Sequence, residues 1–212
     1  MKKQGIFFSD AAPGVFANRE TLYYLLALLN TKYANEIIKL INPTLNFVPG
    51  AVSSVPVKKD EKNKGKIIEI AEGNVQLSEQ DWDSFETSWD FKKHPLLQNV
   101  STISEAFNQW QAECDDRFNQ LKTNEEELNR IFIDIYGLQD ELTPEVEDKD
   151  VTVRKADLQR DIKSLLSYAV GCMFGRYSTY KDGLLFAGEP YSLQTFMDKM
   201  NDRPGTISAE EL

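Results

Sequence analysis

Apolar residues recur every three or four positions through most of the chain, and this spacing predicts amphipathic helices. The first such stretch covers 20–41, after a cap at Asn18, and forms one long helix or two helices joined near Asn30. Further helices are expected over 103–121, over 124–136 and over 152–177. Gly137 suits the end of the middle one, because glycine readily adopts the left-handed conformation that ends many helices. Residues 78–81 (SEQD) resemble a capping box that opens a turn. Gly171 and Gly175 form a G-x-x-x-G spacing, which here favours close packing against a neighbouring helix.

Short apolar pieces between turn residues predict strands near the N-terminus. Residues 5–9 (GIFFS) read as a buried strand, and LNFVPG and SSVPV, within 45–57, read as brief extended pieces. Prolines at 49 and 56 suit strand edges and turns, because proline cannot donate to a strand ladder. The predicted fold class is therefore α+β and mainly α, with a small strand-containing N-terminal module followed by a helical C-terminal module.

Composition indicates a globular protein. The 212 residues are 41% hydrophobic, which allows one sizeable core or a modest core with an added module. No apolar run is long enough to cross a membrane, and the apolar stretch at the start is too short for a secretory signal, so we expect a cytoplasmic protein. Cys114 and Cys172 lie far apart in the sequence and predict two reduced thiols that serve packing.

The net charge of −10 conceals a gradient along the chain. Residues 1–70 carry 10 Lys or Arg against 6 Asp or Glu, a net of +4, so the remaining residues carry 14 against 28, a net of −14. Phosphate contacts require basic surface. The first third is therefore the part expected to meet a polyanion, if any part does.

An aromatic connector with no clear periodicity covers 82–97 (WDSFETSWDFKKHPLL). Burying its large side chains would offset much of the entropy lost on ordering an irregular segment. We expect these aromatics to pin the connector or to dock it on another domain; they are Trp82, Phe85, Trp89 and Phe91. The alternative is base stacking on an unpaired strand beside Lys92, Lys93 and His94, which the acidic residues of the same stretch disfavour. His94 is expected to be a surface or packing residue.

Three stretches carry a family resemblance. Residues 22–57 resemble the end of the target-recognition domain of large adenine-specific DNA methyltransferases related to type IIG restriction-modification enzymes. Residues 81–97 and 125–177, with NRIFIDIYGLQDEL and SYAVGCMFGRYS, are similar to the PglX-like methyltransferases of BREX phage-defence systems. The resemblance spans nearly the whole chain.

The resemblance implies a C-terminal fragment of a larger enzyme. Such enzymes bind S-adenosylmethionine at a glycine-rich loop and hold a flipped adenine with an Asn-Pro-Pro-aromatic motif. This sequence has no G-x-G, and Asn42-Pro43-Thr44-Leu45 lacks the aromatic ring. We therefore expect no catalytic, cofactor or metal residues here, with S-adenosylmethionine bound by an upstream methyltransferase domain of the parent enzyme.

The resemblance also divides the chain by role. It implies the C-terminal part of a DNA target-recognition domain over 1–57, a lysine-rich link and aromatic connector over 58–98, and a helical module over 99–212. Polar side chains would read base edges and lysines would meet phosphates of double-stranded DNA. The candidates are Arg19, Asn30, Lys32, Lys39, Asn42, Asn46, Lys58 and Lys59. Caps, turns and solvated side chains are the competing interpretation of each.

Other functions have weaker support in the sequence. A helical interaction module that docks defence-system partners without touching DNA is the main alternative. An independent hydrolase is disfavoured because no nucleophile–base pair stands out. Glu147-Asp148-Lys149, with Glu145 nearby, has the acid-x-Lys form of a metal-dependent nuclease, but it lies in an acidic connection where a solvated loop is the better interpretation.

Overall fold

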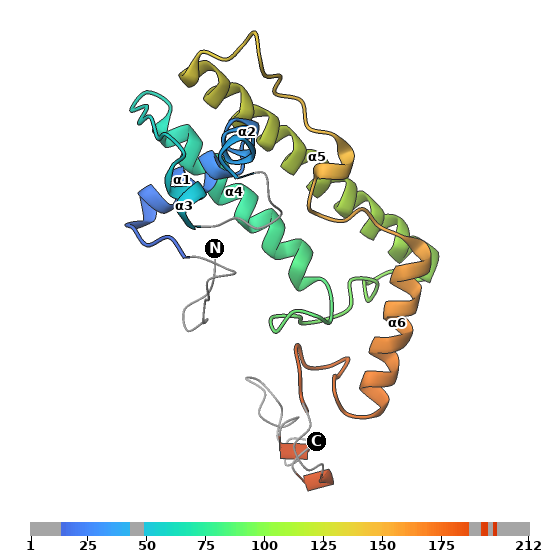
Figure 1. Cartoon of the computed structure of the whole chain (residues 1–212). Helices are drawn as coiled ribbons and strands as arrows, with labels where there is room; N and C mark the ends of the chain where they lie inside the picture. The colour runs from blue at the N-terminus through green and yellow to red at the C-terminus, as the bar shows by residue number, and fades with distance from the viewer. Residues whose placement is uncertain (1–13, 43–48, 187–191, 195–196, 199–212) are drawn as a thin grey trace. The chain divides into compact units, whose positions relative to one another are not determined.

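The computed structural model describes residues 14–42, 49–186, 192–194 and 197–198, and every regular element within them is a helix (Figure 1). The predicted α+β class is therefore wrong for this part of the chain. The strand predicted at 5–9 and residues 45–48 of the predicted extended piece LNFVPG lie outside it. The elements are α1 (Arg19–Leu29), α2 (Lys32–Ile41), α3 (Pro49–Ser53), α4 (Lys64–Asp83), α5 (Ile103–Tyr136), the 3-10 helix η1 (Asp148–Asp150) and α6 (Leu158–Met173).

The proline-punctuated piece after residue 48 is helical where a strand was expected. Pro49 opens α3, where its missing N–H costs no hydrogen bond. Ser53 and Ser54 each donate a hydroxyl to the carbonyl of Gly50, at 2.9 and 2.8 Å. The Gly50 carbonyl thus has hydrogen-bond donors within its own segment, and it needs no partner in a β-sheet.

The chain divides into two compact units by its internal contacts. Unit 1 contains the described residues of 1–78 together with 117–153, and unit 2 contains 79–116 together with the described residues of 154–212. These units follow packing, whereas the predicted boundaries at 57 and 98 follow proposed roles. The functional division of the chain therefore stays a prediction.

Unit 1 is built around an apolar core from α1, α2, the first part of α4 and the last part of α5. Leu28, Ile67 and Phe132 are fully buried there, and Tyr24 meets the edge of Phe132 with ring centroids 5.7 Å apart. Of the two arrangements predicted over 20–41, the structure has the second, two helices joined near Asn30. Asn18 caps α1 by accepting from the Thr21 N–H at 2.9 Å, and Thr31 caps α2.

After Gly137, in the left-handed region with φ of 72°, the chain runs back along α5 as a return segment, residues 138–153 (Figure 1). The Asn129 amide donates to the carbonyl of Pro144 at 3.1 Å. Glu126 accepts from the N–H of Val146 at 3.1 Å, and Lys122 binds Asp148 at 2.7 Å. Successive turns of α5 therefore hold this irregular segment in one register.

Helix α5 is continuous where two helices were expected to meet near Asn124. The Asn124 side chain does not cap a new helix there; it donates to Asn74 of α4 at 2.7 Å and accepts from Gln120 at 2.8 Å. Ser78, expected to begin a turn, lies inside α4 and donates back to the Asn74 carbonyl. In both places the polar side chain that suggested a helix start is hydrogen-bonded to a neighbouring helical turn instead.

Unit 2 contains the connector, the first part of α5 and α6. Trp110 and Cys114 of α5 are buried with Leu96, and Phe91 packs with Tyr168 and Tyr177 in a second cluster. Both cysteines are free thiols. The close packing expected at the G-x-x-x-G spacing is local: a Cβ on Gly171 would lie 2.8 Å from the ring of Tyr177, and Gly175 has a φ of 76° that turns the chain back.

Candidate functional site

The predicted DNA contacts that the structure describes all lie in unit 1, on α1, on α2 and just before α4. Arg19 pairs with Glu72 at 3.1 Å while its side chain remains 75% exposed. Lys39 pairs with Glu36 at 2.8 Å within α2 and is also exposed. Exposed ion pairs of this kind contribute little to stability, so both cations can exchange their partners for phosphates at small cost.

The asparagines among these candidates have local backbone roles. The Asn30 amide donates to the Leu26 carbonyl at 2.8 Å at the end of α1. Asn42 ends α2 with its backbone N–H bound to the Ile38 carbonyl at 2.8 Å, and the N–H of Lys32 donates to Asn129 at 2.9 Å. Asn46 lies outside the described residues. The capping interpretation thus describes Asn30, while direct DNA contact by any candidate stays a prediction.

Three tyrosines hold the backbone that precedes α4. Tyr136 donates to the Pro56 carbonyl at 2.6 Å and accepts from the Lys58 N–H at 2.9 Å. Tyr24 donates to the Lys58 carbonyl at 2.7 Å. Tyr33 stacks on Tyr136 with centroids 3.7 Å apart, and burial together with this neighbour raises the pKa of Tyr33 to about 12. Tyr24, Tyr33 and Tyr136, here called the tyrosine clamp, therefore fix the backbone around residue 58.

The clamp determines what the two neighbouring lysines can do. The Lys58 ammonium lies 5.0 Å from the centroid of the Tyr136 ring and 3.3 Å from the Ile135 carbonyl, so the protein already engages it. The side chain of Lys59 is exposed. Of this predicted pair, Lys59 is the better placed to reach a phosphate, from a backbone that the tyrosines keep rigid.

The four predicted docking aromatics of the connector fall into two groups, those that are packed and those that are exposed. Phe91 is buried against Tyr168 and Tyr177, with ring centroids 5.8 and 5.5 Å away, and Phe85 packs beside the Trp110 cluster. In contrast, Trp82 and Trp89 are 54% and 92% exposed. The phenylalanines anchor the segment, and the tryptophans are the members available to a partner.

Hydrogen bonds around Ser88 fix the turn that carries Trp89. The buried Ser88 hydroxyl donates to Asp83 at 2.5 Å and accepts from the Asp90 N–H at 3.0 Å. The Ser88 N–H also donates to the Phe85 carbonyl at 2.9 Å. Trp89 is therefore presented to solvent from an ordered turn, which is a costly arrangement for a large apolar side chain.

His94 is a packing residue in this structure. It is 3% exposed, and its Nδ1 accepts from the Leu96 N–H at 3.2 Å. Burial lowers its pKa to about 4, against a smaller opposing effect of Asp161. A neutral, buried imidazole of this kind cannot bind a phosphate by charge, which removes His94 from the base-stacking hypothesis.

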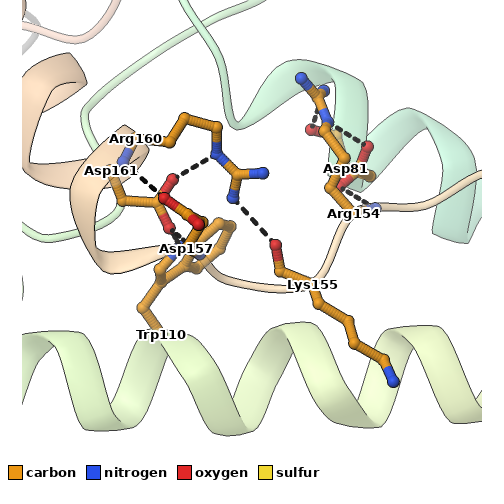
Figure 2. Close-up of polar contacts among 7 residues, drawn as sticks. All are labelled: Asp81, Trp110, Arg154, Lys155, Asp157, Arg160 and Asp161. Atoms are coloured by element: carbon orange, nitrogen blue, oxygen red, sulfur yellow. Dashed lines mark hydrogen bonds and ion pairs between the residues drawn. The ribbon is translucent and has the colours of Figure 1, made fainter.

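A buried carboxylate organises the start of α6 (Figure 2). Asp161 is 2% exposed, and one of its oxygens accepts from Trp110 Nε1 and from the Asp157 N–H, each at 3.0 Å. Its other oxygen accepts from Arg160 Nε at 2.7 Å. Arg160 also donates to the Lys155 carbonyl at 2.9 Å. The charge is thus matched by donors from α5, α6 and the backbone.

A second carboxylate and Phe85 complete this group. Asp81 accepts from the N–H and from the Nε of Arg154, both at 3.1 Å (Figure 2). The Arg154 guanidinium lies 3.4 Å from the centroid of Phe85, with that of Arg160 at 5.3 Å. A cation over an aromatic ring is attracted by the partial negative charge of the ring face, which arises from the ring quadrupole. The network therefore holds the end of α4, through Asp81, and the connector, through Phe85, against the segment before α6.

Sequence reasoning missed this network, although one signal was present. Asp161 occupies a position on the inward stripe of α6, with Leu165 and Tyr168 following at helical spacing. A carboxylate at such a position requires a buried partner. The identity of the partners, Trp110 and Arg160, depends on tertiary packing that the spacing does not reveal.

The nuclease-like triplet is arranged as a solvated loop. Glu147 pairs with Lys149 at 2.7 Å, with both side chains 72% exposed, and Asp148 pairs with Lys122 of α5. In the part of the chain that the structure describes, no group of three acidic, cysteine or histidine side chains could hold a metal ion. Nor is any helix there long and apolar enough to span a lipid bilayer.

Comparison with known proteins gives two relatives and no matching family model. In an alignment of 208 residues that covers 93% of its length, the chain is 47% identical to an adenine-specific methyltransferase PglX of Lacticaseibacillus casei (strain Zhang). In an alignment of 204 residues that covers 88% of its length, it is 30% identical to an adenine-specific methyltransferase BrxX of Escherichia coli O9:H4 (strain HS). The chain spans 17% of the length of each. The resemblance to PglX-like methyltransferases is confirmed.

Proposed function

We propose that this chain is a non-catalytic segment of a larger adenine-specific DNA methyltransferase of the PglX kind, and that it supports DNA target recognition in phage defence. The similarity to two adenine-specific methyltransferases over about nine-tenths of the chain carries this proposal. Methyl transfer from S-adenosylmethionine would be performed by the rest of the polypeptide. This agrees with a sequence that has neither G-x-G nor Asn-Pro-Pro-aromatic.

The physical case for DNA contact rests on unit 1. The tyrosine clamp fixes the backbone at residue 58, and exposed cations lie on it and on the first two helices, at Arg19, Lys39 and Lys59. Basic groups on a rigid backbone fix register on phosphates with little loss of entropy. The ion pairs that occupy Arg19 and Lys39 are exposed, so phosphates can compete for both residues.

A salt series tests this role. We expect the chain to bind a DNA duplex with an affinity that falls steeply as salt rises, because each phosphate contact releases counterions. The double variant Lys39→Ala/Lys59→Ala should weaken binding and flatten the plot of log affinity against log salt by about one unit per lost contact. Fluorescence anisotropy of a labelled duplex gives both quantities.

Lys163→Ala, which removes an exposed lysine from α6, is the matched control and should leave affinity and slope unchanged. If the control and the double variant lose equal affinity, the cations of unit 1 have no special role. Absence of binding even at low salt would instead favour the second candidate function, a module that docks protein partners without touching DNA. The exposed Trp89 supports that candidate, because tryptophan is enriched at the centres of protein interfaces.

A further inference from the structure

Helix α6 carries an apolar face that is wider than the part of it packed in unit 2. On one part of this face Ile162, Leu165, Tyr168 and Cys172 pack into the clusters of unit 2. Beside them, on the part of this face that is not packed, Leu166, Val170 and Met173 are 61%, 50% and 82% exposed. Their spacings of four and three residues place them in one row along the helix. Phe174, directly after the helix, is 79% exposed and extends this outer row.

Such a helix is unusual at a protein surface. A surface helix normally has one apolar stripe, which packs against the core, and polar residues on its exposed positions. Single exposed apolar residues need no explanation, but a contiguous row of four large ones marks a surface that is covered in the working protein. The outer row holds no charged side chain, so DNA phosphates have nothing to bind on it.

We propose that the outer row of α6 docks on a part of the parent methyltransferase polypeptide that lies outside these 212 residues. This inference rests on the proposed function. The chain spans 17% of the length of its two relatives, so in a protein of their length most of the polypeptide is available to cover the row. The partner surface is apolar and belongs to the same molecule.

The size of the row favours a covalently linked partner over a second copy of the chain. A stable association between separate molecules buries roughly 800 Å² on each partner, and four side chains on one helix supply only part of that area. A tethered surface does not lose the translational freedom that separate molecules lose. A row of this size is therefore sufficient within one polypeptide.

Site-specific photo-crosslinking tests the inference. A benzophenone amino acid replaces Met173 in the full-length polypeptide that contains these residues, and it replaces the exposed Glu113 of α5 as the matched control. After irradiation, mass spectrometry should find Met173 joined to peptides of the same polypeptide outside the 212 residues, and the Glu113 position should not give this product. Cross-links confined to the 212 residues, cross-links between copies, or no cross-link would overturn the inference.

Two further measurements separate this inference from the proposed function. Adenine methylation by the full-length polypeptide tests the proposed function alone, so methylation without the Met173 cross-link rejects only the docking surface. The 212-residue chain should sediment as a monomer. A dimer that the double variant Leu166→Ser/Met173→Ser dissociates would show that a second copy covers the row, and would also overturn the inference.

Discussion

Replacing Asp161 with asparagine is expected to lower the free energy of unfolding by about 3–4 kcal/mol, because the buried charge is matched by hydrogen bonds that an amide cannot reproduce. One carboxylate oxygen accepts from Trp110 and from the Asp157 N–H, and the other accepts from Arg160. An amide NH₂ placed at either oxygen would face a donor. Arg160 would also lose the charge that it neutralises.

Guanidinium denaturation followed by tryptophan fluorescence measures this loss, since Trp110 lies inside the network. The control is Asp116→Asn, an exposed position on the same helix as Trp110, where we expect a change within about 0.5 kcal/mol. Equal stability of the two variants would mean that the network around Asp161 does not lock unit 2. The hydrogen-bonded connector would then need another source of order.

Acidification is expected to destabilise the protein through His94. Its pKa is about 4 in the folded state and ordinarily 6.5, so between these values the unfolded chain binds more protons than the folded chain. Stability contributed by the neutral imidazole is present above pH 6.5 and is lost as the pH falls towards 4. The loss is about 2–3 kcal/mol for a shift of this size.

His94→Asn keeps an acceptor near the position of Nδ1 and removes the titration, so its stability should fall less over the same pH range. Glu125, whose pKa burial and Asp150 raise to about 7, gives the opposite trend between pH 4.5 and 7. Because Glu125 is present in both proteins, its contribution cancels when the two pH profiles are subtracted. Parallel profiles for the wild type and His94→Asn would contradict a buried neutral imidazole.

Helical periodicity predicted the helices better than it predicted their ends. The break at Asn30 and the cap at Asn18 followed from side chains that bind their own backbone. The false break near Asn124 and the false start at Ser78 came from the same residue types. In the structure these side chains bind Asn74 or the preceding helical turn instead. A capping residue and a helix-surface residue differ only in their surroundings, which one sequence does not contain.

Within the described residues, the prediction of extended chain after Pro49 was wrong for a related reason. Prolines and β-branched residues after Pro49 indicated extended chain, yet α3 forms there and tyrosine hydroxyls bind the Pro56 and Lys58 carbonyls. These tyrosines come from positions 24, 33 and 136, far apart in the sequence. Long-range contacts of this kind override local preference.

The sequence showed which kinds of residue the candidate site contains, but it did not show how their side chains are arranged. The aromatic content of the connector showed that something anchors it, and Phe85 and Phe91 do so. Nothing in the alternation of residues indicated that Trp89 would be exposed while His94 is buried. His94 lies beside Tyr168, with ring centroids 6.0 Å apart, and this tyrosine comes from a distant part of the sequence.

Methyl transfer to DNA adenine tests the central claim most directly. The assay compares the 212-residue chain alone with the Lacticaseibacillus casei relative in which this chain replaces its matching segment, and with that relative lacking the segment. With S-adenosylmethionine as donor, the account predicts transfer by the chimera and none by the isolated chain or the shortened enzyme. Transfer by the isolated chain, or undiminished transfer by the shortened enzyme, would contradict a non-catalytic segment on which a larger methyltransferase depends.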